Sequence, residues 1–174
     1  MKKFIYLFLA ITVIFSSCKK EEGCTDSLAT NFNIDAENDD GSCIFGITGG
    51  SWITQSIETT GSMTVSLGGF PLLDSTLNII ETNPDSLEPY KLTFTDNGLY
   101  TEYDNLDNVT EGGTWSVLGD QLTINTPDTT FLMVIESIDR ENAVLSMDFI
   151  ESSSDDGVTI DIDLTQTINS IREW

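Results

Sequence analysis

The chain of 174 residues contains no histidine, only seven lysines and arginines, and only three cysteines. The lack of histidine excludes Ser-His-Asp triads and histidine-ligated catalytic zinc sites. With 29 acidic residues the net charge is −22, which argues against nucleic-acid binding and against electrostatic docking on anionic lipid. The acidic composition predicts a solvated surface that keeps the protein monomeric, with cation binding as the alternative.

Long apolar runs are absent except at the N-terminus. The single such run, Phe4–Phe15, follows Lys2 and Lys3. It is too short for a spanning helix, which needs roughly 20 apolar residues, and it is typical of a secretory signal. Small residues then precede Cys18, an arrangement that resembles the lipobox of bacterial lipoproteins. The resemblance implies removal of residues 1–17 and acylation of Cys18 with diacylglycerol and a further fatty acid such as palmitate. A plain signal peptide or an uncleaved anchor is the alternative.

The resemblance also implies a location. Two or three acyl chains on one residue give stable membrane anchoring. The charged run Lys19–Glu22 completes a tether, residues 18–22, and resembles the surface-export signal of Bacteroidetes-type lipoproteins. We therefore expect a lipid anchor in the outer membrane with the protein on the cell surface. The periplasmic face is the alternative.

The next segment, residues 23–46, is a small acidic module. With Cys18 assigned to lipid, Cys24 and Cys43 remain, and a pair of cysteines in an exported chain predicts one disulfide. A segment this short needs such a staple because it cannot bury a core. Gly23–Cys43 resembles a short flavobacterial module with the pattern G-C-x-D-x-x-A-x-N-[FY]-[ND]-x-x-A-x-x-D-D-G-S-C.

Oxygen donors are crowded in this module, as calcium sites require. The segment is similar in character to thrombospondin type 3 calcium repeats, although its glycine spacing departs from the EF-hand loop. The alternative is that these residues form Asx turns in a polar linker. No other cofactor is expected. The candidate calcium ligands are Asp26, Asn31, Asn33, Asp35, Asp39 and Asp40.

Residues 47–174 show short alternating segments rather than helical periodicity, which predicts an all-β domain. Asp96-Asn97-Gly98 is a strong hairpin turn. Strands are expected over 52–57, 63–67, 77–80, 90–95, 99–103, 114–117, 122–124, 131–138, 143–149 and 158–165. Eight to ten sequential strands with short turns fit an up-and-down antiparallel barrel, which has no free edges.

Two motifs resemble lipocalins. Gly50-Ser51-Trp52 is similar to their G-x-W, and segments 90–100 and 112–124 resemble the "L-T-F-x-x-d-G-x-Y … G-x-W-x-v-x-g-d-x-L-x-I" pattern of bacterial lipocalin-like domains. The resemblance implies a barrel that binds a small apolar ligand and a structural role for Trp52 at the barrel floor. The alternative is a non-catalytic interaction or accessory module whose barrel is filled by side chains.

No catalytic residue is expected, because no phosphate-binding glycine loop and no sheltered carboxylate pair is evident. Gly68–Leu73 is apolar and contains two glycines, which favours a lid or rim or, equally, a buried loop. The candidate ligand-binding residues are Phe70, Leu72, Phe94, Trp115, Phe131 and Met147.

Overall fold

A computed structural model describes residues 20–174, so the expected signal segment and Cys18 lie outside the described residues. The chain divides into two compact units between Phe45 and Gly46, where the sequence placed the boundary between residues 46 and 47. Every regular element in the described part is a β-strand, which confirms the all-β fold. Within residues 20–174, no helix is long and apolar enough to cross a membrane.

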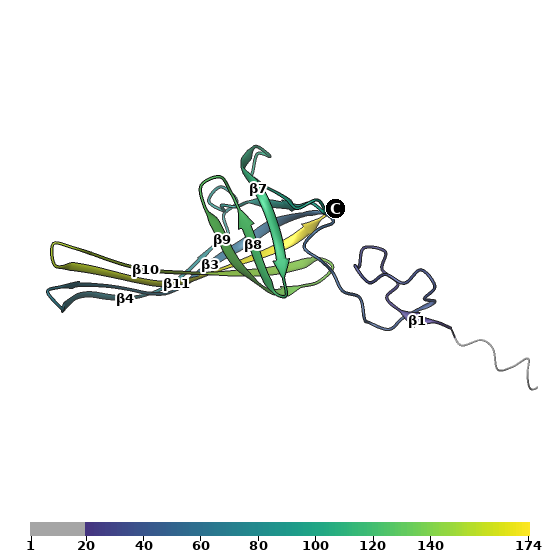
Figure 1. The fold of residues 1–174 in the computed structure, drawn as a ribbon, viewed down its shortest axis with the longest axis horizontal. Coiled ribbons are helices and arrows are strands. Elements are labelled where there is room, and N and C mark those ends of the chain that lie inside the picture. The colour runs from purple at the N-terminus through teal and green to yellow at the C-terminus, as the bar shows by residue number, and fades with distance from the viewer. Residues whose placement is uncertain (1–19) are drawn as a thin grey trace, which may run out of the picture. The chain divides into compact units, whose positions relative to one another are not determined.

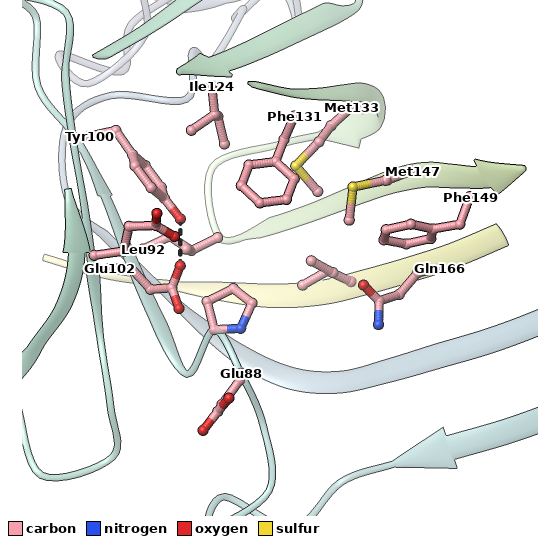
Figure 2. Close-up of a pocket in the computed structure, with 13 residues that line it drawn as sticks. Glu88, Leu92, Tyr100, Glu102, Ile124, Phe131, Met133, Met147, Phe149 and Gln166 are labelled. Atoms are coloured by element: carbon pink, nitrogen blue, oxygen red, sulfur yellow. Dashed lines mark hydrogen bonds between the residues drawn. The ribbon is translucent and has the colours of Figure 1, made fainter. Parts of the chain in front are cut away.

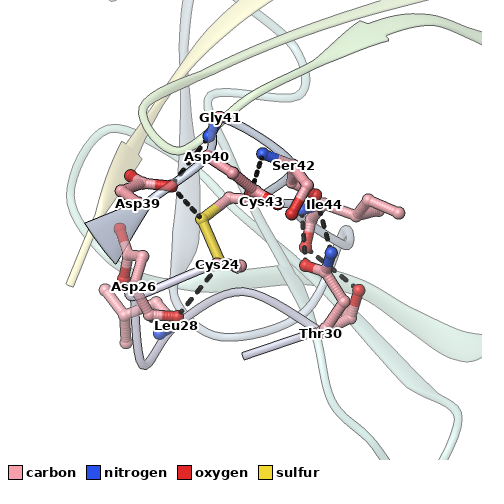
Figure 3. Close-up of a disulfide and its surroundings, with 11 residues drawn as sticks. Cys24, Asp26, Leu28, Thr30, Asp39, Asp40, Gly41, Ser42, Cys43 and Ile44 are labelled. Carbon is pink, nitrogen blue, oxygen red and sulfur yellow. Dashed lines mark hydrogen bonds between the residues drawn. A yellow bond between two sulfur atoms is a disulfide. The ribbon is translucent and has the colours of Figure 1, made fainter. Parts of the chain in front are cut away.

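The N-terminal unit is held by a disulfide. Cys24 and Cys43 are bonded with an S–S distance of 2.06 Å, which confirms the predicted pair (Figure 3). Strand β1 (Glu22–Gly23) pairs in parallel with β2 (Asn38–Asp39) beside this bond. Between residues 20 and 45, only Cys24 and Ala29 among the apolar residues are buried. The unit therefore depends on its covalent bond rather than on a hydrophobic core.

The second unit, residues 46–174, contains a closed barrel of eight antiparallel strands (Figure 1). Each barrel strand pairs with the next along the chain, and the last returns to the first. The predicted up-and-down barrel is thus confirmed. Its strands are β3 (Ser51–Leu67), β5 (Lys91–Phe94), β6 (Leu99–Tyr103), β7 (Val109–Leu118), β8 (Gln121–Asn125), β9 (Thr130–Ile138), β10 (Asn142–Asp155) and β11 (Val158–Glu173).

Trp52 anchors the packed part of the barrel. Its side chain is 1% exposed, and its indole Nε1 donates a hydrogen bond to the carbonyl oxygen of Ile47 at 2.7 Å. The guanidinium of Arg172 lies 4.2 Å from the centre of the indole ring and donates to the carbonyl of Gly46. Phe94 and Leu122 pack into the same core. Trp52 therefore has a structural role, as its position in the first strand indicates.

Three strands are longer than a barrel of this size needs, and together with β4 (Phe70–Glu81) they form an arm. The arm consists of residues 58–67 of β3, all of β4, residues 147–155 of β10 and residues 158–167 of β11. Figure 1 shows it extending away from the barrel wall. The segments expected as separate strands, 52–57 and 63–67, are one continuous strand because β4 and β11 pair with β3 on both sides of 58–62.

The predicted lid is wrong. Gly68 and Gly69 form the turn at the tip of the arm, with φ values of 57° and 84°. Phe70–Leu73, expected as a lid, rim or buried loop, begins β4 instead. Its side chains are exposed, since β4 has only β3 as a neighbour.

The arm has two dissimilar faces, because residues paired across strands share a face and successive residues alternate. The apolar face carries charges only at its margins, Glu81, Glu151 and Asp155. The opposite, acidic face carries Glu58, Asp74, Asp148, Asp161 and Asp163 among serines and threonines, with Ile80 and Ile150 as isolated apolar residues. Thr59, Gly61, Ser75, Ser153 and Gln166 also lie on the apolar face, whose twelve apolar residues are Met63, Val65, Leu67, Phe70, Leu73, Leu77, Ile79, Phe149, Val158, Ile160, Ile162 and Leu164.

Candidate functional site

A cavity of about 250 Å³ lies inside the barrel, next to the packed core. Several residues of the packed core also line the cavity, among them Leu92, Ile124, Met133 and Ile168. The barrel is therefore neither fully hollow nor fully filled. One part is packed around Trp52, and another leaves space beside β9, β10 and β11.

One side of the cavity is apolar (Figure 2). Phe131 and Met133 come from β9, where alternation turns them inward while Leu132 and Val134 remain exposed. Met147 of β10 lies beside them. Flexible methionine side chains adapt to irregular apolar shapes, which suits a site that accommodates a guest molecule.

The other side is polar. The hydroxyl of Tyr100 donates a hydrogen bond to Glu102 Oε2 at 2.9 Å, and Glu88 and Glu111 also line the cavity (Figure 2). Burial raises the pKa of the Glu102 carboxyl above its usual range, and the nearby charges of Glu111 and Glu88 act in the same direction. Burial likewise raises the pKa of the Tyr100 phenol. Three carboxylates therefore face one end of an otherwise apolar space.

The lining of the cavity extends toward the arm. Gln166 pairs with Met147, and Phe149 pairs with Leu164 one step further along the same face. Phe149 and Gln166 both line the cavity, and Phe149 also belongs to the apolar face of the arm. A continuous apolar surface thus runs from the barrel interior onto the arm.

The structure brings two of the six candidate ligand-binding residues into this cavity, Phe131 and Met147. Phe94 is 1% exposed in the core, and Trp115 packs edge-on against it with ring centres 5.7 Å apart. Phe70 and Leu72 are exposed on the arm. Large aromatic residues fill the core as readily as they line cavities, so residue type alone could not separate these roles.

Sequence reasoning missed the polar end of the cavity. Glu102 lies two residues after Tyr100 in β6, and positions two apart in a strand share a face. Tyr100 is buried, so a carboxylate in register with it must point toward the interior. The polar end could therefore have been predicted from Glu102, an acidic residue on the inward face of the expected strand 99–103.

The calcium candidates of the N-terminal module are engaged in local turns. The Oδ1 atoms of Asp26, Asp39 and Asp40 accept hydrogen bonds from backbone amides two residues further on (Figure 3). Hydrogen bonds from the side chain of Ser42 and then from its backbone amide lower the pKa of Asp40. The Oδ1 of Asn33 accepts from the amide of Asp35 in the same manner, and Asn31 bonds to Ser42 and Ile44. Across residues 20–174, no cluster of three or more acidic, cysteine or histidine side chains forms a metal site. This geometry favours the Asx-turn interpretation, and calcium binding stays a prediction.

Comparison with known proteins adds no relative. No family model matches the chain, and no curated protein and no solved structure is significantly similar to it. The lipoprotein and lipocalin-like resemblances therefore rest on the sequence motifs, and the eight-stranded barrel is compatible with the second of them.

Proposed function

We propose that the barrel binds a small, mainly apolar molecule in the cavity beside β9 and β10. The observation that carries the proposal is a cavity of about 250 Å³ within a barrel whose remaining interior is tightly packed. Pockets for drug-sized ligands usually measure about 300–1,000 Å³, so this cavity suits a smaller molecule or one that continues outward past Phe149. The role is binding rather than catalysis.

The carboxylates at one end restrict the class of ligand. Glu88, Glu102 and Glu111 would repel a fatty-acid carboxylate and would favour an amine or a hydroxyl that donates hydrogen bonds. The expected ligand is therefore an apolar molecule with a neutral or positively charged polar end.

Displacement of the fluorescent probe N-phenyl-1-naphthylamine tests this proposal. Decanol and decylamine should displace it from the full-length chain at neutral pH at concentrations at least about tenfold lower than decanoate, the equivalent of about 1.4 kcal/mol. Filling the cavity with Met147→Trp should abolish the displaceable signal. The matched control Ile150→Trp, on the other face of the same strand, should not.

Two results would contradict the proposal. Equal displacement by decanoate would show that the carboxylates do not select the ligand. Unchanged binding by Met147→Trp would place the probe outside the cavity and favour the second candidate, an accessory module without a small-molecule ligand. The packed core around Trp52 is the feature that supports this second candidate.

We further propose that Cys18 anchors the chain in the outer membrane, with the barrel on the cell surface. The support is the run of small residues before Cys18 and the charged tether after it. Wild type and Ser16→Ala, which keeps a small residue, should partition into Triton X-114, and Cys18→Ala should move to the aqueous phase. Continued detergent partitioning of Cys18→Ala would contradict the anchor. Protease digestion of intact cells would distinguish the surface from the periplasmic face.

A further inference from the structure

The apolar face of the arm has no covering element in the described chain. Its residues continue the inward-facing positions of the barrel, where Ile57, Leu145 and Ile168 are at most 3% exposed. Beyond them none of the twelve apolar residues of this face is buried, and Phe70 at the tip is 76% exposed. Contiguous apolar surface of this kind on a folded domain marks an interaction site.

We propose that a second copy of this chain covers the apolar face, so that two arms pack face to face and the protein is a dimer rather than the monomer that its acidic composition predicts. Aligned sheets pack about 10 Å apart with strand directions within about 30°, and each sheet then supplies half of a new core. An interface of this type is isologous, since the same patch contributes from both copies.

Charge favours a second copy through this face. The chain carries a net charge of −22, so association through most surfaces would bring carboxylates together. The apolar face is the exception, because its charges lie at the margins while Asp74, Asp148, Asp161 and Asp163 point to the other side of the arm. Two arms packed on this face would leave both acidic faces in water.

The area is sufficient for a stable contact. The exposed part of the face runs from residue 59 to residue 67 of β3, or about 30 Å at roughly 3.3 Å per residue, and four strands at about 4.8 Å span about 19 Å. Two such faces bury about 1,100 Å² even as flat surfaces, and a biological interface is expected to exceed about 1,000 Å².

The barrel fixes the direction of the second arm. The apolar face continues into the barrel interior, so the barrel wall rises on this side of the arm at its base (Figure 1). A second barrel at the same end would collide with the first. The two arms must therefore run in opposite directions, which brings each tip, with Leu67 and Phe70, to the base of the other copy's arm, near the cavity-lining Gln166.

Neighbouring positions on one strand provide a matched test. Val65 lies on the apolar face and Thr64 on the acidic face of β3. Light scattering of the full-length chain should give twice the mass of one chain. Val65→Asp should raise the dimer dissociation constant at least about a hundredfold, because it buries an unpaired charge in the interface, whereas Thr64→Asp should change it by less than about threefold.

A second measurement keeps the test decisive if Val65→Asp fails to fold. In a Cys18→Ala background, which leaves no other free thiol, Ile162→Cys on the apolar face should be joined into dimers by a short bismaleimide crosslinker, and the adjacent Asp161→Cys on the acidic face should not. A wild-type chain that is monomeric at about 100 μM, which corresponds to an affinity weaker than roughly 5–6 kcal/mol, would overturn the proposal. Equal crosslinking of the two variants, or flotation of the Cys18→Ala chain with phosphatidylcholine vesicles in place of dimers, would also overturn it.

Discussion

The barrel and the arm belong to the same sheet and share three strands, yet the apolar face is covered in the barrel and uncovered in the arm. In the barrel the sheet closes around its apolar face, so that Leu145 and Ile168 are almost inaccessible to solvent. In the arm the same face of β10 and β11 continues without anything opposite it. Alternation along a strand therefore specifies that one face is apolar, but not which surface will cover it.

The largest expected difference between the two regions concerns aromatic residues. Trp52→Ala should lower the free energy of unfolding by about 3–5 kcal/mol, because it removes a buried ring together with its hydrogen bond to Ile47. Phe70→Ala, at the arm tip, should change the stability of the monomer by less than about 0.5 kcal/mol. Urea denaturation of both variants measures the comparison, and similar costs would show that the arm tip is packed within one chain.

A pair of isoleucines on β11 tests the boundary between barrel and arm. Ile168 is 2% exposed and Ile162 is partly exposed, although both lie on the same face. Ile168→Ala should cost about 2–4 kcal/mol, and Ile162→Ala about 1 kcal/mol or less in the monomer. At concentrations where dimers form, the cost of Ile162→Ala should increase. A cost for Ile162→Ala equal to that of Ile168→Ala in dilute solution would contradict the boundary.

Gly61 tests how closely the strands of the arm approach. Its φ is +141°, and a Cβ atom there would lie 2.1 Å from the carbonyl oxygen of Asp163. Gly61→Ala should therefore destabilise the arm by about 1–3 kcal/mol and speed hydrogen exchange in β4 and β11. Exchange in the barrel strands β6 to β8 serves as the internal control. Unchanged exchange in the arm would contradict this geometry.

The smallest expected effect concerns Glu102. Because burial raises its pKa in the folded state, the native protein binds this proton more tightly than the unfolded chain does. The contribution of Glu102 to stability is then fully present below the unfolded pKa of about 4.3, and it is lost as the pH rises through the raised folded pKa. Glu102→Gln removes this loss, so it should stabilise the protein near pH 7 by under about 1 kcal/mol after solvent screening is considered. A variant that is less stable than wild type at pH 7 but equal at pH 4 would contradict this direction.

The sequence predicted the barrel and the disulfide because both have local indications. Hairpin turns such as Asp96-Asn97-Gly98 separate the strands, and Cys24 and Cys43 form an isolated pair. The arm lacked such indications. Residues 58–62 are polar and end in Gly-Ser, which is typical of a turn, and they are a strand only because β4 and β11 pair on either side. That pairing depends on tertiary structure.

The candidate site was partly predictable, because the direction in which a side chain points is a local property of a strand. The expected strands placed Phe131 and Met147 among the large inward-facing residues, and both line the cavity. Alternation could not tell them from Phe94, because a packed core and a cavity use the same apolar positions. The difference depends on how well side chains from opposite strands meet, and this is a property of the closed barrel.

Methionine methyl groups offer the most direct test, since Met133 and Met147 lie in the cavity and Met63 lies on the apolar face of the arm. We predict that decanol, added to the full-length chain with labelled methionine methyl groups, shifts the NMR signals of Met133 and Met147. Dilution of the same sample should instead shift the signal of Met63. A decanol titration that moves Met63 and leaves Met133 unchanged would contradict a binding site inside the barrel.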